Sequence, residues 1–232
     1  TSGLTLTEKV LTPTELQVNL QICKKELHSD WEAAQMGFSA FDNLPPLFSD
    51  FVIARVAAEV AQATENSIWG GAAAEGNFDG FKTIMQADSD VVDVTGTSVT
   101  AANVITELNK VVDAIPSGVY GTDDLVLYVS TAIAKAYIQA QAALGYRELY
   151  NVGQTEMNYQ GIPMFVTAGL NTNNAVAARK SNLYFGTGLL NDRNEVKVID
   201  MADIDGSQNV RVVMRYTAGV QIGVGADIVL YS

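Results

Sequence analysis

Hydrophobic and polar residues alternate along residues 15–22, which predicts a half-buried strand. The apolar members are Leu16, Val18, Leu20 and Ile22. A period of two places them on one face and the polar residues between them on the other. Residues 24–41 then mix aromatic and polar side chains ahead of Pro45-Pro46, which predicts a short helix and a loop.

A long helix is predicted over residues 50–69. The apolar positions at helical spacing are Phe51, Val52, Val56, Val60, Thr64 and Ile68. Ser49 and Asp50 can accept hydrogen bonds from the free N–H groups of the first turn, and Gly70-Gly71 ends the helix. We expect Val56 and Val60, one turn apart, to face a sheet. Arg55 and Glu59 interrupt the apolar run, so this helix is not expected to span a membrane.

The composition changes after residue 71 to Gly, Asn, Asp and small residues, which indicates a domain border. A second helix is expected over 100–114, with Pro116 beyond its end. Residues 124–129 predict a strand covered on both faces. Ser130 would cap a third helix whose apolar stripe includes Ile138 and which stops at Gly145. Further strands are expected at 164–167, 183–185, 196–200, 210–216 and 220–231.

The overall composition excludes several functional classes. The 232 residues include 26 acidic and 14 basic side chains, so the net charge is −12. This sign opposes binding of phosphates over a broad surface. The hydrophobic fraction is 48% and the charged fraction only 17%, which argues against disorder. A surface with so few charges presents neutral and apolar area, for which subunit contacts are one explanation. These observations predict an α+β protein with no evident active site.

The residues with the strongest chemical potential occur singly. Cys23 is the only cysteine and His28 the only histidine. Cys23 therefore cannot form an intramolecular disulfide, and we interpret it as a small buried hydrophobic residue. His28 cannot form an imidazole-rich metal cluster, and we interpret it as solvated or capping. No nucleotide-binding loop, zinc motif or nucleophile elbow occurs in the sequence.

Ser130, Asp123 and Asp124 are candidates for nucleophilic or acid–base chemistry. Ser130 lies between a strand and a helix but lacks flanking glycines, so a helix cap is the better interpretation. Asp123 and Asp124 are adjacent on an extended chain and would point to opposite faces. We interpret them as part of a loop and a strand entry.

Three polar or glycine-rich segments also have structural interpretations. Residues 203–206 resemble part of a calcium loop but lack enough carboxylates, so a turn between strands is expected. Residues 223–225 contain two glycines of a dinucleotide motif without the following helix, which indicates a strand bend or bulge. Asp88, Asp90 and Asp93 are expected in a solvated loop. The sequence therefore predicts no catalytic, cofactor-binding or metal-binding residue, and no enzyme.

The order of several short strings along the chain carries a family resemblance. They are residues 16–25 (LQVNLQICKK), 48–51 (FSDF), 64–71 (TENSIWGG), 77–81 (NFDGF), 159–164 (YQGIPM), 182–186 (NLYFG), 210–216 (VRVVMRY) and 230–231 (LY). In this order and spacing the chain resembles the major capsid proteins of tailed bacteriophages with the Hong Kong 97-like fold. The resemblance covers nearly the whole chain.

The resemblance implies an α+β capsid fold of two domains. A peripheral domain, with a long spine helix on an antiparallel sheet, is expected at residues 1–69 and 191–217. An axial domain, with a central sheet flanked by helices, is expected at residues 70–190 and 218–232. The family also has an N-terminal arm and an extended loop before the first peripheral strand, and we expect this sequence to begin too late to contain both.

The function implied by the resemblance is structural. Many copies would assemble as hexamers and pentamers into an icosahedral phage head, made in the bacterial host cytoplasm and located in the virion. Scaffold, portal or decoration proteins are possible partners, contact with packaged DNA would be weak and local, and no membrane or cofactor is implied. An encapsulin-like nanocompartment shell is the main alternative. A carboxylate-dependent hydrolase is a distant one, for which no residue pair can be assigned.

Overall fold

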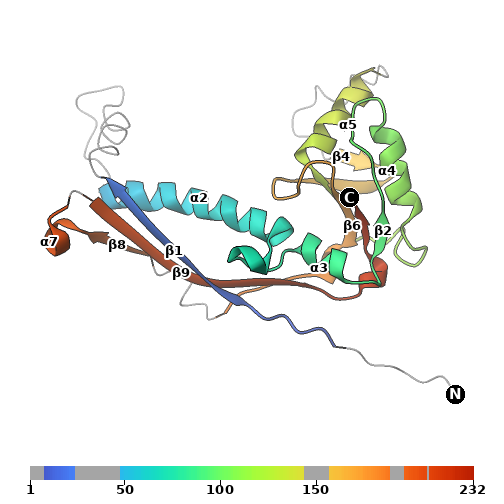
Figure 1. Ribbon diagram of the computed structural model, residues 1–232. Coiled ribbons are helices and arrows are strands. Elements are labelled where there is room, and N and C mark those ends of the chain that lie inside the picture. The colour runs from blue at the N-terminus through green and yellow to red at the C-terminus, as the bar shows by residue number, and fades with distance from the viewer. Residues whose placement is uncertain (1–7, 24–47, 144–156, 189–195, 208) are drawn as a thin grey trace. The chain divides into compact units, whose positions relative to one another are not determined.

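The computed structural model describes residues 8–23, 48–143, 157–188, 196–207 and 209–232 and has an α+β architecture with two sheets (Figure 1). The chain divides into two compact units. The larger unit comprises Thr1–Thr12, Glu65–Gly186 and Gly219–Ser232, and the smaller comprises Pro13–Thr64 and Thr187–Ala218. Helix α2 (Phe48–Gly70) and strand β9 (Asn209–Ile222) contribute residues to both units.

A mixed six-stranded sheet forms the centre of the larger unit. Its strands, in spatial order, are β2 (Val92–Val94), β10 (Val229–Tyr231), β6 (Ala175–Arg179), β3 (Leu125–Ser130), β5 (Ile162–Thr167) and β4 (Met157–Tyr159). β3 runs parallel to β5 and antiparallel to β6, and its Leu127 is aligned with Met164 and Ala177. β3 is covered on both faces, as its continuous apolar run predicted. The sequence analysis did not predict β2, β4 or β6.

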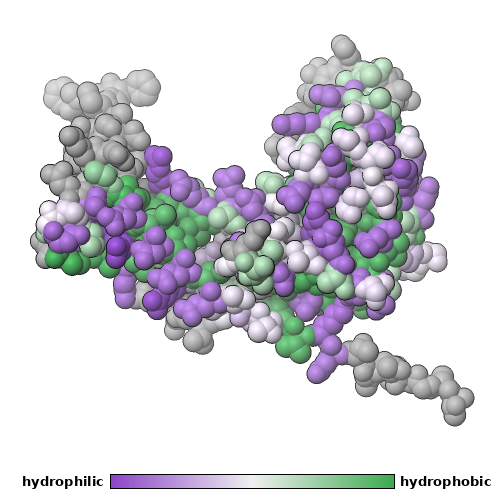
Figure 2. All heavy atoms as spheres, in the orientation of Figure 1, coloured by the Kyte–Doolittle hydropathy of each residue, from purple (hydrophilic) through white to green (hydrophobic). Residues whose placement is uncertain are grey.

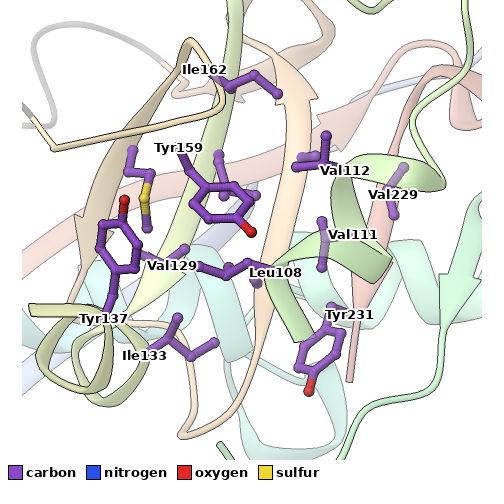
Figure 3. Packing of buried hydrophobic residues seen from close by; sticks show 14 of the residues in the cluster. Leu108, Val111, Val112, Val129, Ile133, Tyr137, Tyr159, Ile162, Val229 and Tyr231 are labelled. Atoms are coloured by element: carbon purple, nitrogen blue, oxygen red, sulfur yellow. The ribbon is translucent and has the colours of Figure 1, made fainter. Parts of the chain in front are cut away.

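Helices α4 (Val104–Asp113) and α5 (Thr131–Ala143) pack on one face of this sheet (Figure 3). The buried residues of α4 are Val104, Glu107, Leu108, Val111 and Val112. On α5, Ile133 and Tyr137 are buried, and the rings of Tyr137 and Tyr159 form a T-shaped pair with centroids 5.7 Å apart. The expectation for Ile138 was wrong, because it is 43% exposed. One residue beyond Tyr137 is a rotation of about 100°, which turns its side chain away from the sheet.

The opposite face of the sheet is partly covered by aromatic residues. Trp69, in the last turn of α2, contacts Tyr128 of β3 with ring centroids 5.0 Å apart. It also contacts Phe81 of α3 (Phe81–Ala87), at 5.4 Å. The helix comes close to Gly169, where an added Cβ would lie 2.3 Å from the carbonyl oxygen of Glu65. This approach requires glycine at that position.

Strand β9 differs from the two strands predicted at 210–216 and 220–231. It continues unbroken to Ile222 and pairs there with β7 (Leu183–Gly186). The chain then bends, because the Asn182 side chain brackets the Val224 peptide. Its Oδ1 accepts from the Val224 N–H and its Nδ2 donates to the Val224 carbonyl, both at 2.7 Å. The bend predicted at 223–225 is confirmed, and a 3₁₀ turn, η4 (Gly225–Asp227), then leads into β10. Further 3₁₀ turns are η1 (Ala73–Glu75) and η2 (Lys180–Asn182).

The smaller unit contains an antiparallel sheet covered by α2. β1 (Thr14–Cys23) pairs with β9 over ten residues, and β8 (Val196–Asp200) pairs with the other edge of β9. The strand at 15–22 and the long helix are therefore confirmed. Val52 and Val56 of α2 form a small core with Val212, and Val60 packs against it while partly buried.

The connection from β8 to β9 is a short helix, α7 (Ala202–Asp205), rather than the predicted simple turn. Gly206 ends it with φ of 72°, a left-handed conformation that glycine adopts without strain. The expectations for residues 24–41 and for Gly145 lie outside the described residues. Within those residues, none of the helices has the length and hydropathy needed to cross a membrane.

Candidate functional surfaces

A metal or catalytic centre needs several ionisable side chains close together. Within the described ranges, no group of three or more His, Cys, Asp or Glu residues is arranged to hold a metal ion. Cys23 has a free thiol and is half-buried at the end of β1, so it is more exposed than predicted. His28 lies outside the described residues.

Ser130 acts as a helix cap, as predicted. Its side chain is buried, and its Oγ accepts a hydrogen bond from the Ile133 N–H at 3.4 Å. Asp124 lies at the entry of β3, where the Ser181 Oγ donates to its carboxylate at 2.6 Å. This hydrogen bond lowers the pKa of Asp124 below its usual value. The neighbouring Asp123 is exposed. Ser130 and Asp124 thus form local hydrogen bonds, one at a helix start and the other at a strand entry.

The acidic set at 88–93 is more ordered than a solvated loop. Asp88 ends α3, and its Oδ2 pairs with the Lys9 ammonium at 2.5 Å. Hydrogen bonds from Lys9 and from the Asp90 backbone lower the pKa of Asp88. Asp93 lies within β2 rather than in a loop, with its side chain exposed. Asp88 therefore ties the N-terminal segment to the larger unit.

The sequence analysis missed a buried polar cluster around Glu107. This residue is only 6% exposed, and its carboxylate accepts from Lys110 Nζ at 2.9 Å, the Tyr231 hydroxyl at 2.8 Å and Thr97 Oγ1 at 3.1 Å. The Lys110 hydrogen bond keeps the pKa of Glu107 below its usual value. Burial, together with Glu107, raises the pKa of Tyr231 to about 12.

This cluster attaches the C-terminal strand β10 to α4. Gly96 leaves space for the Tyr231 ring, because a Cβ there would lie 2.2 Å from a ring carbon. The sequence signal that could have identified the cluster is the place of Glu107 within the apolar stripe of its helix. A carboxylate on a buried face needs hydrogen-bond partners. Residues of the larger unit supply these partners, so the cluster serves packing.

Several large apolar side chains of the larger unit are exposed. On β5, Phe165 and Val166 are 47% and 45% exposed. On β7, Tyr184 and Phe185 are 53% and 50% exposed. The Phe165 ring lies beside Tyr128 and under the Lys180 ammonium, 5.0 Å from the ring centroid. Such side chains are typical of contact surfaces.

An open cleft of about 360 Å³ lies between the α4–β3 connection and the β4–β5 turn. It is lined by Tyr120, Gly121, Thr122, Asp123, Leu125, Gln160, Gly161, Ile162 and Pro163. Asp123 is the one carboxylate of this lining. The carboxylate-dependent hydrolase considered as a distant alternative would need a second carboxylate, which this lining does not contain.

The smaller unit exposes apolar surface of a different kind. Its sheet has one apolar face, on which Val18 and Ile22 are half-buried and Leu20 is 36% exposed. Hydrophobic residues also gather over α2 in Figure 2, where Ala54, Ala57, Ala58 and Ala61 are exposed. The other face of the sheet is polar and carries Gln17, Gln21, Arg211 and Arg215. Among the described residues of this unit, the apolar side of the sheet is therefore covered only in part.

No family model and no curated protein matches the sequence. Solved structures, however, match nearly all of the fold. The chain is similar to the capsid of an empty GTA particle, with 14% identity and a TM-score of 0.62 over 100% of this chain and 78% of that one. It is similar to a chain of the satellite phage P4 procapsid, with 10% identity and a TM-score of 0.58 over 100% and 82%.

A third similarity is to the holo-SrpI encapsulin complex of Synechococcus elongatus, with 9% identity and a TM-score of 0.58 over 95% of this chain and 73% of that one. At such low identity these matches establish the fold alone. Both compact units lie within the matched region, which includes the α2 helix, the β1–β9–β8 sheet and the six-stranded sheet. The chain therefore has the Hong Kong 97-like capsid fold.

Proposed function

We propose that this chain is a structural major capsid protein whose copies assemble as hexamers and pentamers into the icosahedral head of a bacteriophage. The observation that carries the proposal is the similarity of 100% of the chain to capsid and procapsid chains. The exposed aromatic residues of the larger unit and the half-covered sheet of the smaller one supply apolar area for contacts between copies.

The proposed peripheral domain comprises residues 1–69 and 191–217, and the proposed axial domain comprises residues 70–190 and 218–232. The compact units support this proposal, because their internal borders, after residues 64, 186 and 218, lie within five residues of the proposed ones. The N-terminal segment is the exception, since Thr1–Thr12 groups with the larger unit. The ion pair between Lys9 and Asp88 links that segment to the end of α3.

We propose no catalytic role. The one buried carboxylate among the described residues, Glu107, is hydrogen-bonded by Lys110, Tyr231 and Thr97. A carboxylate-dependent hydrolase would need a second carboxylate beside Asp123 in the open cleft, and the cleft lining offers none. The chemistry of these residues supports a packing role.

A nanocompartment shell is a second candidate, which the similarity to the encapsulin complex favours. The two candidates differ in content, because a phage head encloses a genome and a nanocompartment encloses protein cargo. Scaffold, portal or decoration proteins would accompany the first candidate.

The net charge limits contact with nucleic acid to local sites. With 26 acidic and 14 basic residues, the subunit repels a polyanion overall. Any contact with packaged DNA would be weak and screened by salt at about 0.15 M. Location in the virion, after synthesis in the host cytoplasm, follows from the proposed role.

Electron microscopy of the full chain expressed in a bacterial host tests the proposal. Closed icosahedral particles containing DNA support the phage capsid, and particles filled with protein and free of DNA support the nanocompartment. Measurement of the absorbance ratio at 260 and 280 nm distinguishes the two contents. A chain that stays monomeric at every concentration and ionic strength tested would contradict both candidates.

A further inference from the structure

Strand β1 has a long edge with no strand partner among the described residues. It contains ten residues in unbroken register with β9, and among the described residues it pairs with no other strand. Every second residue of an edge strand directs its N–H and C=O away from the sheet. Soluble proteins protect such edges by short length, by Lys or Pro, or by a bulge. β1 contains no Lys, Pro or bulge, and its one charged residue is Glu15.

The other strand edges of the described residues are better protected. β2 and β4, at the two ends of the larger sheet, have three residues each. β8 has five residues and carries Lys197 and Asp200. β7, at the other edge of the smaller sheet, has four residues and no charged side chain. β1 therefore stands apart in its length. An edge of this kind is suited to accept a strand from another chain.

The face pattern of β1 restricts how a second copy could pair with it. Leu16, Val18, Leu20 and Ile22 lie on the apolar face of the sheet. These four residues are even-numbered. In an antiparallel pair, directly opposite residues share a face. Two β1 strands therefore form one continuous apolar face only if the residue numbers of each directly opposite pair add up to an even number. With the full overlap, residue 14 opposite 23, the sum is odd and the apolar face would meet the polar one.

Charge selects between the two nearest even registers. In one, Val18 lies opposite itself and Glu15 opposite Gln21. In the other, Asn19 lies opposite itself and Glu15 opposite Cys23. Arg211 is beside Gln21 on β9, and its Nη2 donates to Gln21 Oε1 at 3.3 Å, so the guanidinium reaches toward the edge. The Val18-centred register brings Glu15 of each copy to the Arg211 of the other. Beyond Cys23 the β9 partner is the uncharged Asn209.

We propose that β1 pairs with β1 of a second copy, antiparallel and centred on Val18, with two Glu15–Arg211 ion pairs related by a two-fold axis. The pairing satisfies the edge N–H and C=O groups and brings Leu20 of one copy opposite Leu16 of the other. Such an isologous contact joins two copies only, whereas rings need head-to-tail contacts. If the proposed shell function holds, on which this step rests, the β1 contact links subunits of different rings.

Disulfide trapping tests the register. The background is Cys23→Ser, which removes the only cysteine. Val18→Cys then places two thiols opposite each other, at the Cα separation of about 4.5–5.5 Å that a disulfide accepts. Asn19→Cys is the matched control, because two copies of residue 19 would be diagonal and about 7–8 Å apart. We expect dimers under mild oxidation from Val18→Cys and few from Asn19→Cys. Equal trapping, or trapping by Asn19→Cys alone, would overturn the proposal.

A charge exchange provides an independent test that does not need oxidation. Glu15→Arg should raise the dissociation constant of the dimer by at least about fivefold, and Glu15→Arg with Arg211→Glu should restore it. Glu8→Arg changes the net charge equally at an exposed residue outside the strand and should have little effect. Sedimentation at several concentrations gives the constants, and circular dichroism checks folding. Failure of the double variant to recover, with folding intact, would contradict the ion pairs.

The outcomes separate this proposal from the shell function. Closed particles whose Val18→Cys subunits do not cross-link would overturn the β1 pairing and leave the capsid function standing. Specific Val18→Cys dimers in a chain that never forms particles would support the pairing and contradict the capsid function.

Discussion

The two compact units bury their apolar residues to different degrees. In the larger unit, Leu127, Val129 and Tyr231 are at most 1% exposed, between helices on one face and aromatic residues on the other. Among the described residues of the smaller unit, α2 covers one sheet face, and Val18, Ile22 and Val60 remain half-buried. The larger unit thus buries its central strand on both faces, whereas the described residues of the smaller unit leave apolar side chains of their sheet partly exposed.

Val56→Asp is expected to have the largest effect and to act on the smaller unit. Val56 is 3% exposed in the core with Val52 and Val212, so the carboxylate would be buried without a partner. We expect a loss of at least about 3 kcal/mol of unfolding free energy. Val60→Asp is the control, because that half-buried side chain can turn a carboxylate toward water. Equal destabilisation by both changes, measured by urea denaturation, would show that the helix face is wrongly assigned.

Leu127→Ala examines the larger unit at its central strand. The side chain is fully buried in the core that the sheet forms with α4 and α5, and its truncation leaves a cavity. We expect a loss of about 3 kcal/mol, confined to the larger unit. Proteolysis coupled to mass spectrometry would locate the loosened segments. Cleavage mainly within β1 or β8 would show that the loss of stability is not confined to the larger unit.

Gly169→Ala should destabilise the larger unit by about 1–3 kcal/mol. The added methyl group would lie 2.3 Å from the Glu65 carbonyl oxygen, which is backbone and cannot rotate away. Gly118→Ala is a suitable control, since nothing lies near a Cβ at that position. Thermal unfolding of both variants measures the difference. Matching midpoints would mean that α2 does not approach Gly169 closely.

The smallest expected effect is a pH dependence of the larger unit. Burial, with the neighbouring Glu107, raises the pKa of Tyr231 to about 12, above the value of about 10 for an unfolded chain. A raised pKa stabilises the protonated form, so this contribution is complete below pH 10 and is lost as the pH rises toward 12. Tyr231→Phe should therefore reduce the loss of stability at alkaline pH. The unfolding free energy is measured by urea denaturation at alkaline pH. If it falls with pH as steeply in the variant as in the wild type, another group causes the pH dependence.

A second pH effect has the opposite sign. The Lys110 hydrogen bond lowers the pKa of Glu107, so its contribution is present above the usual glutamate pKa of about 4.3 and is lost as the pH falls further. Glu107→Gln should therefore reduce the loss of stability in acid. Unfolding followed by fluorescence between about pH 5 and 2.5 measures the loss of stability in the wild type and in the variant. If the wild type and the variant lose stability in parallel, the carboxylate is not the group responsible.

The sequence by itself determined the elements with strong local signals. The alternation at 15–22, the helical spacing from Val52 to Val60 and the continuous run of β3 each specified an element, because one period or one buried run allows few arrangements. Cys23 and His28 limited the chemistry by composition alone, since a disulfide or an imidazole cluster needs a second residue of the same kind. The order of short strings also indicated the capsid fold.

The tertiary structure alone decided features that depend on residues distant in sequence. The Asn182 side chain bends the chain at Val224, and Glu107 is buried because Tyr231 and Lys110 supply its hydrogen bonds. The short strands β2, β4 and β6 form because neighbouring strands of the sheet pair with them. Their three to five residues are too few to show a hydrophobic period, so the sequence did not predict them. The place of β1 at the edge of the described sheet is likewise a property of strand order, which local pattern does not encode.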